Sequence, residues 1–487
     1  MFWLQGLNVE TTPSYIGDNW LQKKTKIVCT IGPASVQPEV LEKMFQAGMN
    51  CARINTAYGD MELYKTIVDN VRKTADIPVM IDLKGPEIRL RTNQEKTVKT
   101  GEIVEVGFER EPIRFSHNFI DQINVGDMVF IDNGRIKTTV KEKTDGTIRL
   151  LVEQGGLISD GKGVNIPNKQ LRVPTLSAKD YELADFAKEY EIEFLALSFT
   201  RHAKDVENLK AATEGFNGAV VAKIENFEGI KNFNEILGST EAVMVARGDL
   251  GVEIETEKVP LVQKSLIRRC NQAGKTVVTA TEMLESMMYQ PNPTRAEVSD
   301  VANAILDGTD ATMLSGETAV GKYPVEAVAM MARVATEAEK AAASSIEDQG
   351  FVNISDTVSR SIQRICRSMP LDKIVTLTRS GYTAKMITRF KVPQPIIAVT
   401  SNPLAKRQLE LVYGVIPVHI DYQKETDRIL TVASNLFDMD LLKVEDTVLF
   451  TAAFRTKKKH ASNLIEIHNI KELLELKETD SRPTEEK

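Results

Sequence analysis

Two short stretches of the chain end in charged residues that could do chemistry. The first, Val221–Asn226, places Lys223 and Glu225 two positions apart, and the second, Val245–Asp249, ends in a carboxylate. Side chains alternate between the two faces of a strand, so Lys223 and Glu225 would emerge on the same side. Carboxylates are hard ligands for Mg²⁺ or Mn²⁺, and an ammonium is a point charge for phosphate or enolate. The alternative is a buried structural ion pair.

Eight short apolar runs could form the strands that position these residues. They alternate with helix-like segments and lie at Lys26–Thr30, Met49–Asn55, Val79–Asp82, Phe194–Leu197, Ala219–Ile224, Ala242–Ala246, Thr276–Ala280 and Asp310–Ser315. Such alternation predicts a parallel sheet, and eight units predict a (β/α)₈ barrel, whose active site lies where the strands end. One proline, Pro33, and a set of polar residues stand at or just past these ends; the polar residues are Thr30, Arg53, Asn55, Asp82, Lys84, Ser198, Lys223, Glu225, Asp249, Thr281 and Glu317.

The alternation is interrupted once and changes again towards the C-terminus. Residues 90–173 are rich in Thr, Val, Ile and Gly and predict a small inserted β-domain, placed to act as a lid over the barrel mouth. From about residue 341, strand-like and helical runs predict an open α/β domain. The predicted division is an N-terminal extension at 1–20, a barrel at 21–89 and 174–340, the inserted domain at 90–173, the α/β domain at 341–470 and a charged tail at 471–487.

Composition limits the classes of function. The formal net charge of −7 lacks the basic excess that a general nucleic-acid binder uses to neutralise phosphates. No run approaches the roughly 18 apolar residues of a membrane helix, so we expect no membrane partner. The four cysteines are widely spaced, which predicts reduced core thiols rather than a metal site. We therefore expect a cytoplasmic protein.

The segment Asp82–Arg89 packs four charges around a Gly-Pro turn immediately before the inserted domain. Together with Arg53 it supplies cations that could hold a phosphoryl group in transfer. The alternative is a solvated run of charges.

The segment Thr378–Thr383 follows a strand-like run and precedes a helical one. Its hydroxyls, its glycine and the free amides of a helix N-terminus could bind an anion. An ordinary capped connection between strand and helix explains the same pattern equally well.

Taken in order, these motifs resemble those of the pyruvate kinase family. The similarity runs from Thr25 to about Thr451, and it is carried by Thr25–Ser35, Asp82–Arg89, Lys162–Asn165, Lys223–Asn226, Ala246–Asp249, Ala280–Thr281, Met283–Met287 and Met313–Thr318. The resemblance implies a barrel, a β-barrel lid and a regulatory α/β domain in a homotetramer. It implies transfer of the phosphoryl group of phosphoenolpyruvate to ADP in glycolysis, giving pyruvate and ATP, with allosteric control by a phosphorylated small molecule.

The resemblance also implies roles for individual residues. Catalytic roles fall to Lys223, Arg53, Arg89 and Thr281, with Lys223 stabilising charge that moves between phosphate and enolate oxygens. Substrate contacts fall to Ser198, Lys223, Thr281 and the segment Ala246, Arg247, Gly248 and Asp249. Nucleotide contacts fall to Thr30, Pro33, Arg53, Tyr58 and Lys162. Glu225 and Asp249 are implied as ligands of Mg²⁺ or Mn²⁺, and Asn55, Asp82 and Leu83 as ligands of K⁺.

The sequence departs from the family pattern around the implied K⁺ site. Ala57 removes a hydroxyl ligand, and Tyr58 replaces a histidine near the nucleotide. Leu83 stands where threonine is common, although its main-chain carbonyl could still coordinate. Glu87 is the residue typical of potassium-dependent members. We expect K⁺ activation with a weakened site.

The C-terminal domain carries the implied effector site. Thr378, Arg379, Ser380, Gly381, Tyr382 and Thr383 match the family's effector phosphate loop. The usual glycine-rich segment near the C-terminus is replaced by the basic run Arg455–His460. That run could bind a phosphorylated effector, or it could be a solvated turn.

Two other functions are compatible with parts of this pattern. A metal-dependent lyase acting on pyruvate-like enolates would keep Glu225 and Asp249 but would need neither Lys162 nor the lid. A regulatory or catalytically altered paralogue would explain Ala57 and Tyr58. The presence of the full catalytic set favours pyruvate kinase over both.

Overall fold

Eight parallel strands form a closed barrel in the computed structural model, which describes residues 23–85, 88–109, 111–132, 134–144, 146–167, 169, 171, 174–341, 353–421, 428–453 and 462–480. The strands follow the order β1-β17-β16-β15-β14-β13-β3-β2 around the barrel. They are β1 (Lys26–Thr30), β2 (Cys51–Asn55), β3 (Val79–Leu83), β13 (Phe194–Leu197), β14 (Ala219–Ile224), β15 (Ala242–Ala246), β16 (Thr276–Ala280) and β17 (Ala311–Leu314). The predicted barrel is confirmed.

The barrel strands are apolar because both of their faces are covered. One face packs inside the barrel, where Val28, Met80, Met244 and Met313 form part of a closed cluster. The other face packs on the surrounding helices in the largest apolar core. These helices are α2 (Pro38–Gln46), α3 (Met61–Thr74), α4 (Ala178–Glu189), α5 (Ala203–Ala212), α6 (Phe227–Lys231), α7 (Phe233–Ser239), α8 (Arg247–Glu253), α9 (Val259–Ala273), α10 (Arg295–Leu306), α11 (Gly316–Ala319) and α12 (Pro324–Ala338).

Helix α3 shows how the sequence defines these elements. Asp60 caps its start, because the carboxylate accepts a hydrogen bond from the amide of Leu63. Tyr64, Ile67, Val68 and Val71 are its buried residues, and their spacing of three and four places one apolar stripe against the strands. Short 3₁₀ turns add η2 (Thr256–Lys258), η3 (Glu285–Met288) and η4 (Glu339–Ala341) to the barrel.

The segment between β3 and α4 forms a separate β-structure with its own apolar core. A seven-stranded sheet has the order β12-β8-β9-β10-β6-β7-β4, and β11 pairs with β5 beside it. The bounds are β4 (Leu90–Thr92), β5 (Lys96–Val98), β6 (Ile103–Gly107), β7 (Ile113–Phe115), η1 (Ile120–Gln122), β8 (Met128–Ile131), β9 (Ile136–Thr144), β10 (Thr147–Gln154), β11 (Gly156–Ile158) and β12 (Val164–Asn165). An antiparallel bridge pairs Arg89, just before the edge strand β4, with Gly163, just before the edge strand β12. The β-barrel form of this domain stays a prediction.

The C-terminal part forms a five-stranded sheet in the order β20-β19-β18-β21-β22. Its strands are β18 (Lys373–Leu377), β19 (Ile396–Thr400), β20 (Val415–His419), β21 (Thr447–Ala452) and β22 (Leu464–Asn469). Its helices are α13 (Ile354–Ser368), α14 (Tyr382–Thr388), α15 (Pro403–Leu409), α16 (Arg428–Asp438) and α17 (Ile470–Asp480). Strand β22 is antiparallel to β21 and was missed by the sequence analysis. The open α/β class is confirmed, while the domain limits given above remain predictions.

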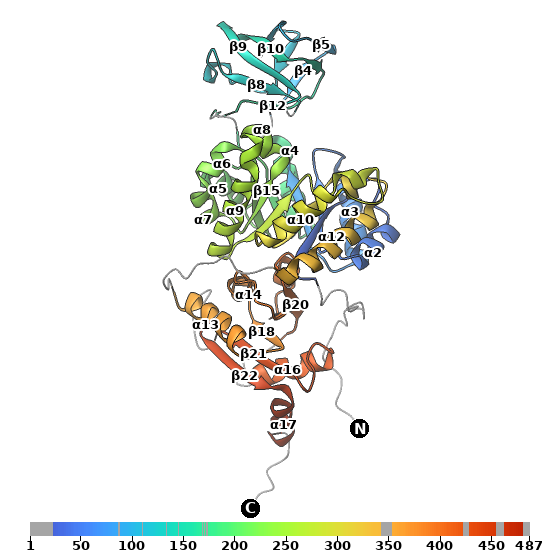
Figure 1. Ribbon diagram of the computed structural model, residues 1–487, viewed down its shortest axis with the longest axis vertical. Helices are drawn as coiled ribbons and strands as arrows, with labels where there is room; N and C mark the ends of the chain where they lie inside the picture. Colours follow the sequence, from blue (N-terminus) through green and yellow to red (C-terminus); the bar gives the residue numbers. More distant parts are fainter. Residues whose placement is uncertain are drawn as a thin grey trace, which may run out of the picture.

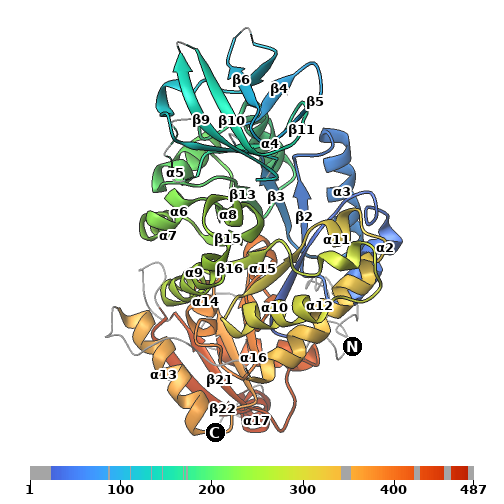
Figure 2. The ribbon, with the colours of Figure 1, turned by 45° about the horizontal axis from the view of Figure 1, so that its top comes forward.

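The three sheets lie in a row along the molecule. Figure 1 shows the inserted β-structure at one end, the barrel in the middle and the C-terminal sheet at the other end. After the rotation in Figure 2, the inserted sheet lies over the part of the barrel that carries α4, α8 and the ends of β3 and β13. The C-terminal sheet is thus on the opposite side of the barrel from the edge where the predicted catalytic residues gather.

Candidate active site

A buried charge cluster lies where three neighbouring barrel strands end. The ammonium of Lys223 on β14 donates to Ser198 Oγ at 2.7 Å and lies 2.8 Å from Glu225 Oε1 and 3.0 Å from Asp82 Oδ1. These side chains are all at most 8% exposed as residues. Strands β3, β13 and β14 are adjacent and parallel, so their ends meet at one edge of the barrel. The sequence analysis predicted that these four residues lie at the same edge, and the structure places them there.

Arg53 extends this cluster from the neighbouring strand β2. Its guanidinium donates twice to Asp82 Oδ2, at 2.9 and 2.6 Å, and once to Thr30 Oγ1 at 2.7 Å. Burial alone would raise the pKa of Asp82, but the charges of Lys223 and Arg53 outweigh it and hold the pKa below its ordinary value. Asp82 therefore stays ionised and fixes the direction of two cations. Thr30 was predicted to contact the nucleotide, and in the structure its hydroxyl accepts a hydrogen bond from Arg53.

The Lys223 ammonium remains charged. Burial by itself would lower the pKa of Lys223, but the carboxylates of Asp82 and Glu225 raise it above its ordinary value. A permanent positive charge in a nearly dry site attracts an anion far more strongly than the same charge in water. The site can therefore stabilise negative charge on a small ligand.

The two predicted metal ligands, Glu225 and Asp249, are carboxylates that repel each other. Burial raises the pKa of Glu225 to about 7, with Lys223 opposing the shift and Asp249 adding to it. Glu225 Oε2 also accepts a hydrogen bond from the amide of Phe199 at 2.7 Å, which fixes its orientation. Asp249 lies on α8, immediately after β15. Two neighbouring carboxylates that repel each other suit a divalent cation, whose charge would relieve the repulsion.

The loop after β16 carries Thr281 in a strained conformation. Thr281 and Glu282 both have positive φ angles, of 66° and 54°, which is unusual for residues with a side chain. Arg247 holds them there, because its guanidinium donates to the carbonyl oxygens of Thr281 at 2.6 Å and of Glu282 at 3.0 Å. The amide of Gly248 donates to Thr281 Oγ1 at 2.8 Å. Arg247 therefore supports the loop, and the same side chain pairs with Asp300 at 2.7 Å.

Two predicted cations belong to the inserted β-structure or its hinge. Arg89 donates to the carbonyl oxygen of Gly161 at 2.5 Å, and Lys162 lies 2.9 Å from the carboxylate of Asp132. The same structure meets the barrel at α8, where Asn165 Nδ2 donates to Glu253 Oε1 at 2.9 Å. Sequence reasoning missed Asp132 and Glu253. The only signal was that Asp132 begins an Asp-Asn-Gly turn and that Glu253 follows Asp249 by one helical turn.

The remaining predicted nucleotide contacts are open to solvent. Pro33 is exposed, and Tyr58 is 77% exposed at the end of the loop after β2. Neither side chain is among the contacts of the charge cluster described above. They stay predictions.

The predicted K⁺ ligands lie beside the cluster. Asn55 and Asp82 are paired across β2 and β3, and Leu83 follows in a fully buried position. Asn55 Oδ1 accepts a hydrogen bond from the amide of Ala57 at 3.1 Å. Side-chain and carbonyl oxygens at adjacent strand ends suit a monovalent cation. Glu87, the residue typical of potassium-dependent members, lies outside the described residues.

The predicted effector loop connects β18 to α14. Gly381 adopts a φ of 77° as the residue before α14, a conformation that glycine takes without strain. An added Cβ at Gly381 would lie 2.8 Å from Leu409 of α15, so the loop packs directly on that helix. Thr383 shares a hydrogen bond of 2.5 Å with Ser462. Arg455–His460, the basic run that would face this loop, lies outside the described residues.

Comparison with known proteins identifies the family. A family profile for "Pyruvate kinase, barrel domain" matches residues 22–328, and a profile for "Pyruvate kinase, alpha/beta domain" matches residues 356–468. The chain is 40% identical to the pyruvate kinase of Sporosarcina psychrophila over 93% of this chain and 81% of the relative. It is 40% identical to that of Geobacillus stearothermophilus over the same shares, and 39% identical to that of Staphylococcus aureus strain MRSA252 over 92% and 80%.

A barrel with a buried lysine, two arginines and a pair of carboxylates near its carboxyl edge defines an enzyme for anionic substrates. The chain belongs to the pyruvate kinase family, and it is a phosphotransferase. The prediction made from the motifs is confirmed, and the comparisons favour neither the lyase nor the regulatory paralogue.

Among the described residues, no helix has the length and apolar character needed to cross a membrane.

Proposed function

We propose that the protein transfers the phosphoryl group of phosphoenolpyruvate to ADP, giving pyruvate and ATP, at the edge where β3, β13, β14 and β15 end. The observation that carries this proposal is the position of Lys223, whose ammonium contacts Ser198, Asp82 and Glu225 at once. A cation fixed by three neighbours does not need to reorganise when negative charge develops beside it. It is therefore suited to the step in which charge moves from phosphate to enolate oxygen.

The two guanidiniums orient the phosphoryl group in this proposal. Arg53 is held by Asp82 and Thr30, which fixes its guanidinium at the edge where the strands end. Arg89 lies at the hinge of the inserted β-structure and reaches Gly161. Because a guanidinium can contact two phosphate oxygens at once, these residues fix the direction of transfer as well as its charge balance. The predicted participation of Ser198 follows from its contact with Lys223.

Metal requirements follow from the carboxylates. Glu225 and Asp249 would hold Mg²⁺ or Mn²⁺, with oxygens of the substrate completing the coordination. When bound, this ion supplies positive charge to the substrate carboxylate and phosphate. The family is known to need a divalent ion and potassium, and Asn55, Asp82 and the Leu83 carbonyl would hold K⁺ here with weaker support because of Ala57.

The enolate left after transfer must gain a proton. Thr281 Oγ1 is held between the amide of Gly248 and the carbonyl of Ala280, at 2.8 and 2.6 Å. That arrangement fixes the hydroxyl near the end of β16, from where it could pass a proton through water to the enolate carbon. The backbone of Ala246, Arg247, Gly248 and Asp249, at the start of α8, would hold the substrate carboxylate.

The nucleotide would bind between the barrel edge and the inserted β-structure. Lys162 would contact its phosphates from the lid, and Thr30, Pro33, Arg53 and Tyr58 would contact it from the barrel. Residues Thr378 to Thr383 would bind a phosphorylated effector. A homotetramer in the cytoplasm completes the proposal, and it depends on the family rather than on a contact in this chain.

A coupled assay tests the reaction. The purified chain with phosphoenolpyruvate, ADP and Mg²⁺ should form pyruvate, and Lys223→Met should reduce kcat by about 10²-fold to 10³-fold. Lys210→Met, at an exposed lysine of α5, is the matched control and should keep the rate. Absence of turnover in any monovalent salt would favour the regulatory paralogue, and cleavage of a pyruvate-like substrate without ADP would favour the lyase.

A further inference from the structure

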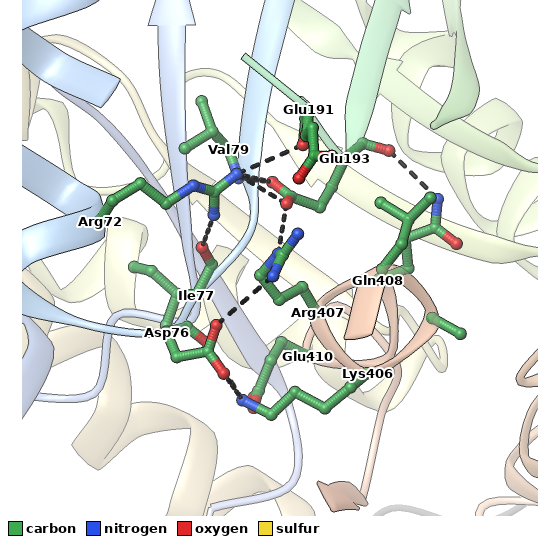
Figure 3. Close-up of polar contacts among 12 residues, drawn as sticks. Arg72, Asp76, Ile77, Val79, Glu191, Glu193, Lys406, Arg407, Gln408 and Glu410 are labelled. Carbon is green, nitrogen blue, oxygen red and sulfur yellow. Dashed lines mark hydrogen bonds and ion pairs between the residues drawn. The ribbon is translucent and has the colours of Figure 1, made fainter. Parts of the chain in front are cut away.

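One buried carboxylate connects the C-terminal sheet to the base of the barrel. Glu193 precedes β13 and is fully buried. Its carboxylate accepts two hydrogen bonds from Arg72 of α3, at 2.7 and 2.8 Å, and one from Arg407 of α15, at 2.5 Å (Figure 3). Arg72 belongs to the barrel, whereas Arg407 comes from the C-terminal sheet's own helix. The pair Glu193–Arg407 therefore crosses the boundary between the two structures.

Glu193 also lies at the starts of three barrel strands. Its second carboxylate oxygen accepts from the amide of Val79, the first residue of β3, at 2.7 Å. Its carbonyl oxygen accepts from the amide of Ala219, the first residue of β14, at 2.8 Å. Strand β13 starts at the next residue in the chain. The bond to Val79 is charge-assisted and buried, and it is therefore stronger than a neutral one. The bond to Ala219 is a neutral backbone bond that joins the start of β14 to the residue before β13.

The same three strands carry the charge cluster at their other ends. Asp82 lies near the end of β3, Ser198 follows β13, and Lys223 lies near the end of β14. The distance along β13 from Glu193 to Ser198 is five residues, or roughly 16 Å. Because the strands pair continuously along this length, a shift at one end is transmitted along the hydrogen-bonded ladder. Glu193 and the cluster thus lie at opposite ends of the same three paired strands.

Arg407 has a second attachment through its helix. Gln408 Nε2 donates to the carbonyl oxygen of Glu193 at 3.3 Å, and Leu409 packs against Gly381 of the 378–383 loop. Helix α15 therefore touches that loop on one side and the strand starts on the other. Its neighbour Lys406 pairs with Asp76 at 2.7 Å, and Arg407 itself lies 3.9 Å from the same carboxylate. The side chain of Asp76 is 52% exposed and bonds no strand start in the described contacts.

We propose that Arg407 is a positioning residue for the reaction: through Glu193 it fixes the starts of β3, β13 and β14, and so the places of Asp82, Ser198 and Lys223 at their far ends. The proposal rests on the function proposed above for those three residues. It also makes α15 the element through which the 378–383 loop is connected to the catalytic edge.

The test compares substitutions in the full chain that break neighbouring ion pairs. Arg407→Gln should raise KM for phosphoenolpyruvate about threefold to thirtyfold and change KM for ADP by less than about twofold. Arg407→Lys, which keeps the charge, should recover part of the loss. Lys406→Gln removes the neighbouring cation of α15, which pairs with Asp76 and Glu410, and should leave both KM values within about twofold of the unchanged protein. Folding should survive, because Glu193 keeps Arg72 and the amide of Val79.

A second measurement does not depend on turnover. Amide hydrogen exchange in Arg407→Gln should be faster in peptides that cover β13 and β14 and unchanged in a peptide that covers β16. The inference is overturned if KM for phosphoenolpyruvate and the exchange of β13 and β14 both stay as in the unchanged protein. It is equally overturned if Lys406→Gln produces the same changes, because the effect would then be a general loosening of the contact between α15 and the barrel. If the unchanged protein showed no turnover, the proposed function would be refuted. The exchange measurement alone would then test whether Arg407 positions β13 and β14.

Discussion

Lys162 and Asp132 form an ion pair of 2.9 Å within the inserted β-structure. Lys162 is the residue predicted to reach the nucleotide from the lid, and in this structure Asp132 holds it inside its own domain. Both side chains are partly exposed, at 30% and 23%. If Lys162 binds a nucleotide phosphate as proposed, that phosphate would compete with a carboxylate for the same ammonium. Asp132 would then limit the availability of Lys162 without taking part in the reaction itself.

Removing this competition should tighten nucleotide binding. Asp132→Asn should lower KM for ADP by about twofold to fivefold, because a partly exposed pair contributes little more than 1 kcal/mol. Asn tolerates the positive φ of 57° at this position, so the turn should be kept. Steady-state kinetics with ADP as the varied substrate measures the effect. Arg135→Gln, at the 81% exposed partner on the same turn, should cause no change. A rise in KM for Asp132→Asn would mean that Asp132 positions Lys162 instead of competing for it.

The sequence was most informative where chemistry follows from local pattern. Alternation of side chains along a strand placed Lys223 and Glu225 on one side, and in the structure their charged atoms lie 2.8 Å apart. The barrel itself followed from eight repeated units. Contacts between distant segments left no such pattern. The pairs Lys162–Asp132 and Glu193–Arg407 join residues 30 and 214 positions apart, and only the packed structure brings them together. Strand β22 was missed because its pairing partner β21, not its own composition, makes it a strand.

The divalent-ion site should depend steeply on Glu225. Glu225→Gln keeps an acceptor for the amide of Phe199 but removes the charge, so the concentration of Mg²⁺ for half-maximal rate should rise about tenfold to a hundredfold. Titration of Mg²⁺ in the coupled assay measures this shift. Glu214→Gln, at an exposed carboxylate after α5, is the control and should leave the titration unchanged. If both variants gave the same titration, Glu225 would not be a ligand of the divalent ion.

Potassium dependence tests the departure at Ala57. The unchanged protein should be faster in K⁺ than in Na⁺, and indifference to both would mean that the site is lost. Ala57→Ser restores a hydroxyl and should lower the K⁺ concentration for half-maximal rate about threefold to tenfold, the value of one added polar contact. Ala57→Val adds bulk without an oxygen and should give no such gain. Equal behaviour of the serine and valine variants would show that the hydroxyl is not a ligand here.

Stability should depend on pH through Glu253, the residue where the inserted β-structure meets α8. Burial raises the pKa of Glu253 from 4.5 to about 7, with the hydrogen bond from Asn165 opposing the shift and Asp249 adding to it. The folded state therefore holds this proton more tightly than the unfolded state. Its contribution to stability is complete below pH 4.5 and is lost as the pH rises through 7.

Glu253→Gln removes this titration while keeping an oxygen that accepts from Asn165. Relative to the unchanged protein, the free energy of unfolding of Glu253→Gln should rise steadily between pH 4.5 and 7 and level off above pH 7. Urea denaturation at a series of pH values, in the absence of divalent ions, measures the difference. Glu257→Gln, at an exposed position of η2, should give a difference that does not vary with pH. A constant difference for Glu253→Gln as well would mean that burial does not raise the pKa of Glu253 in the folded protein.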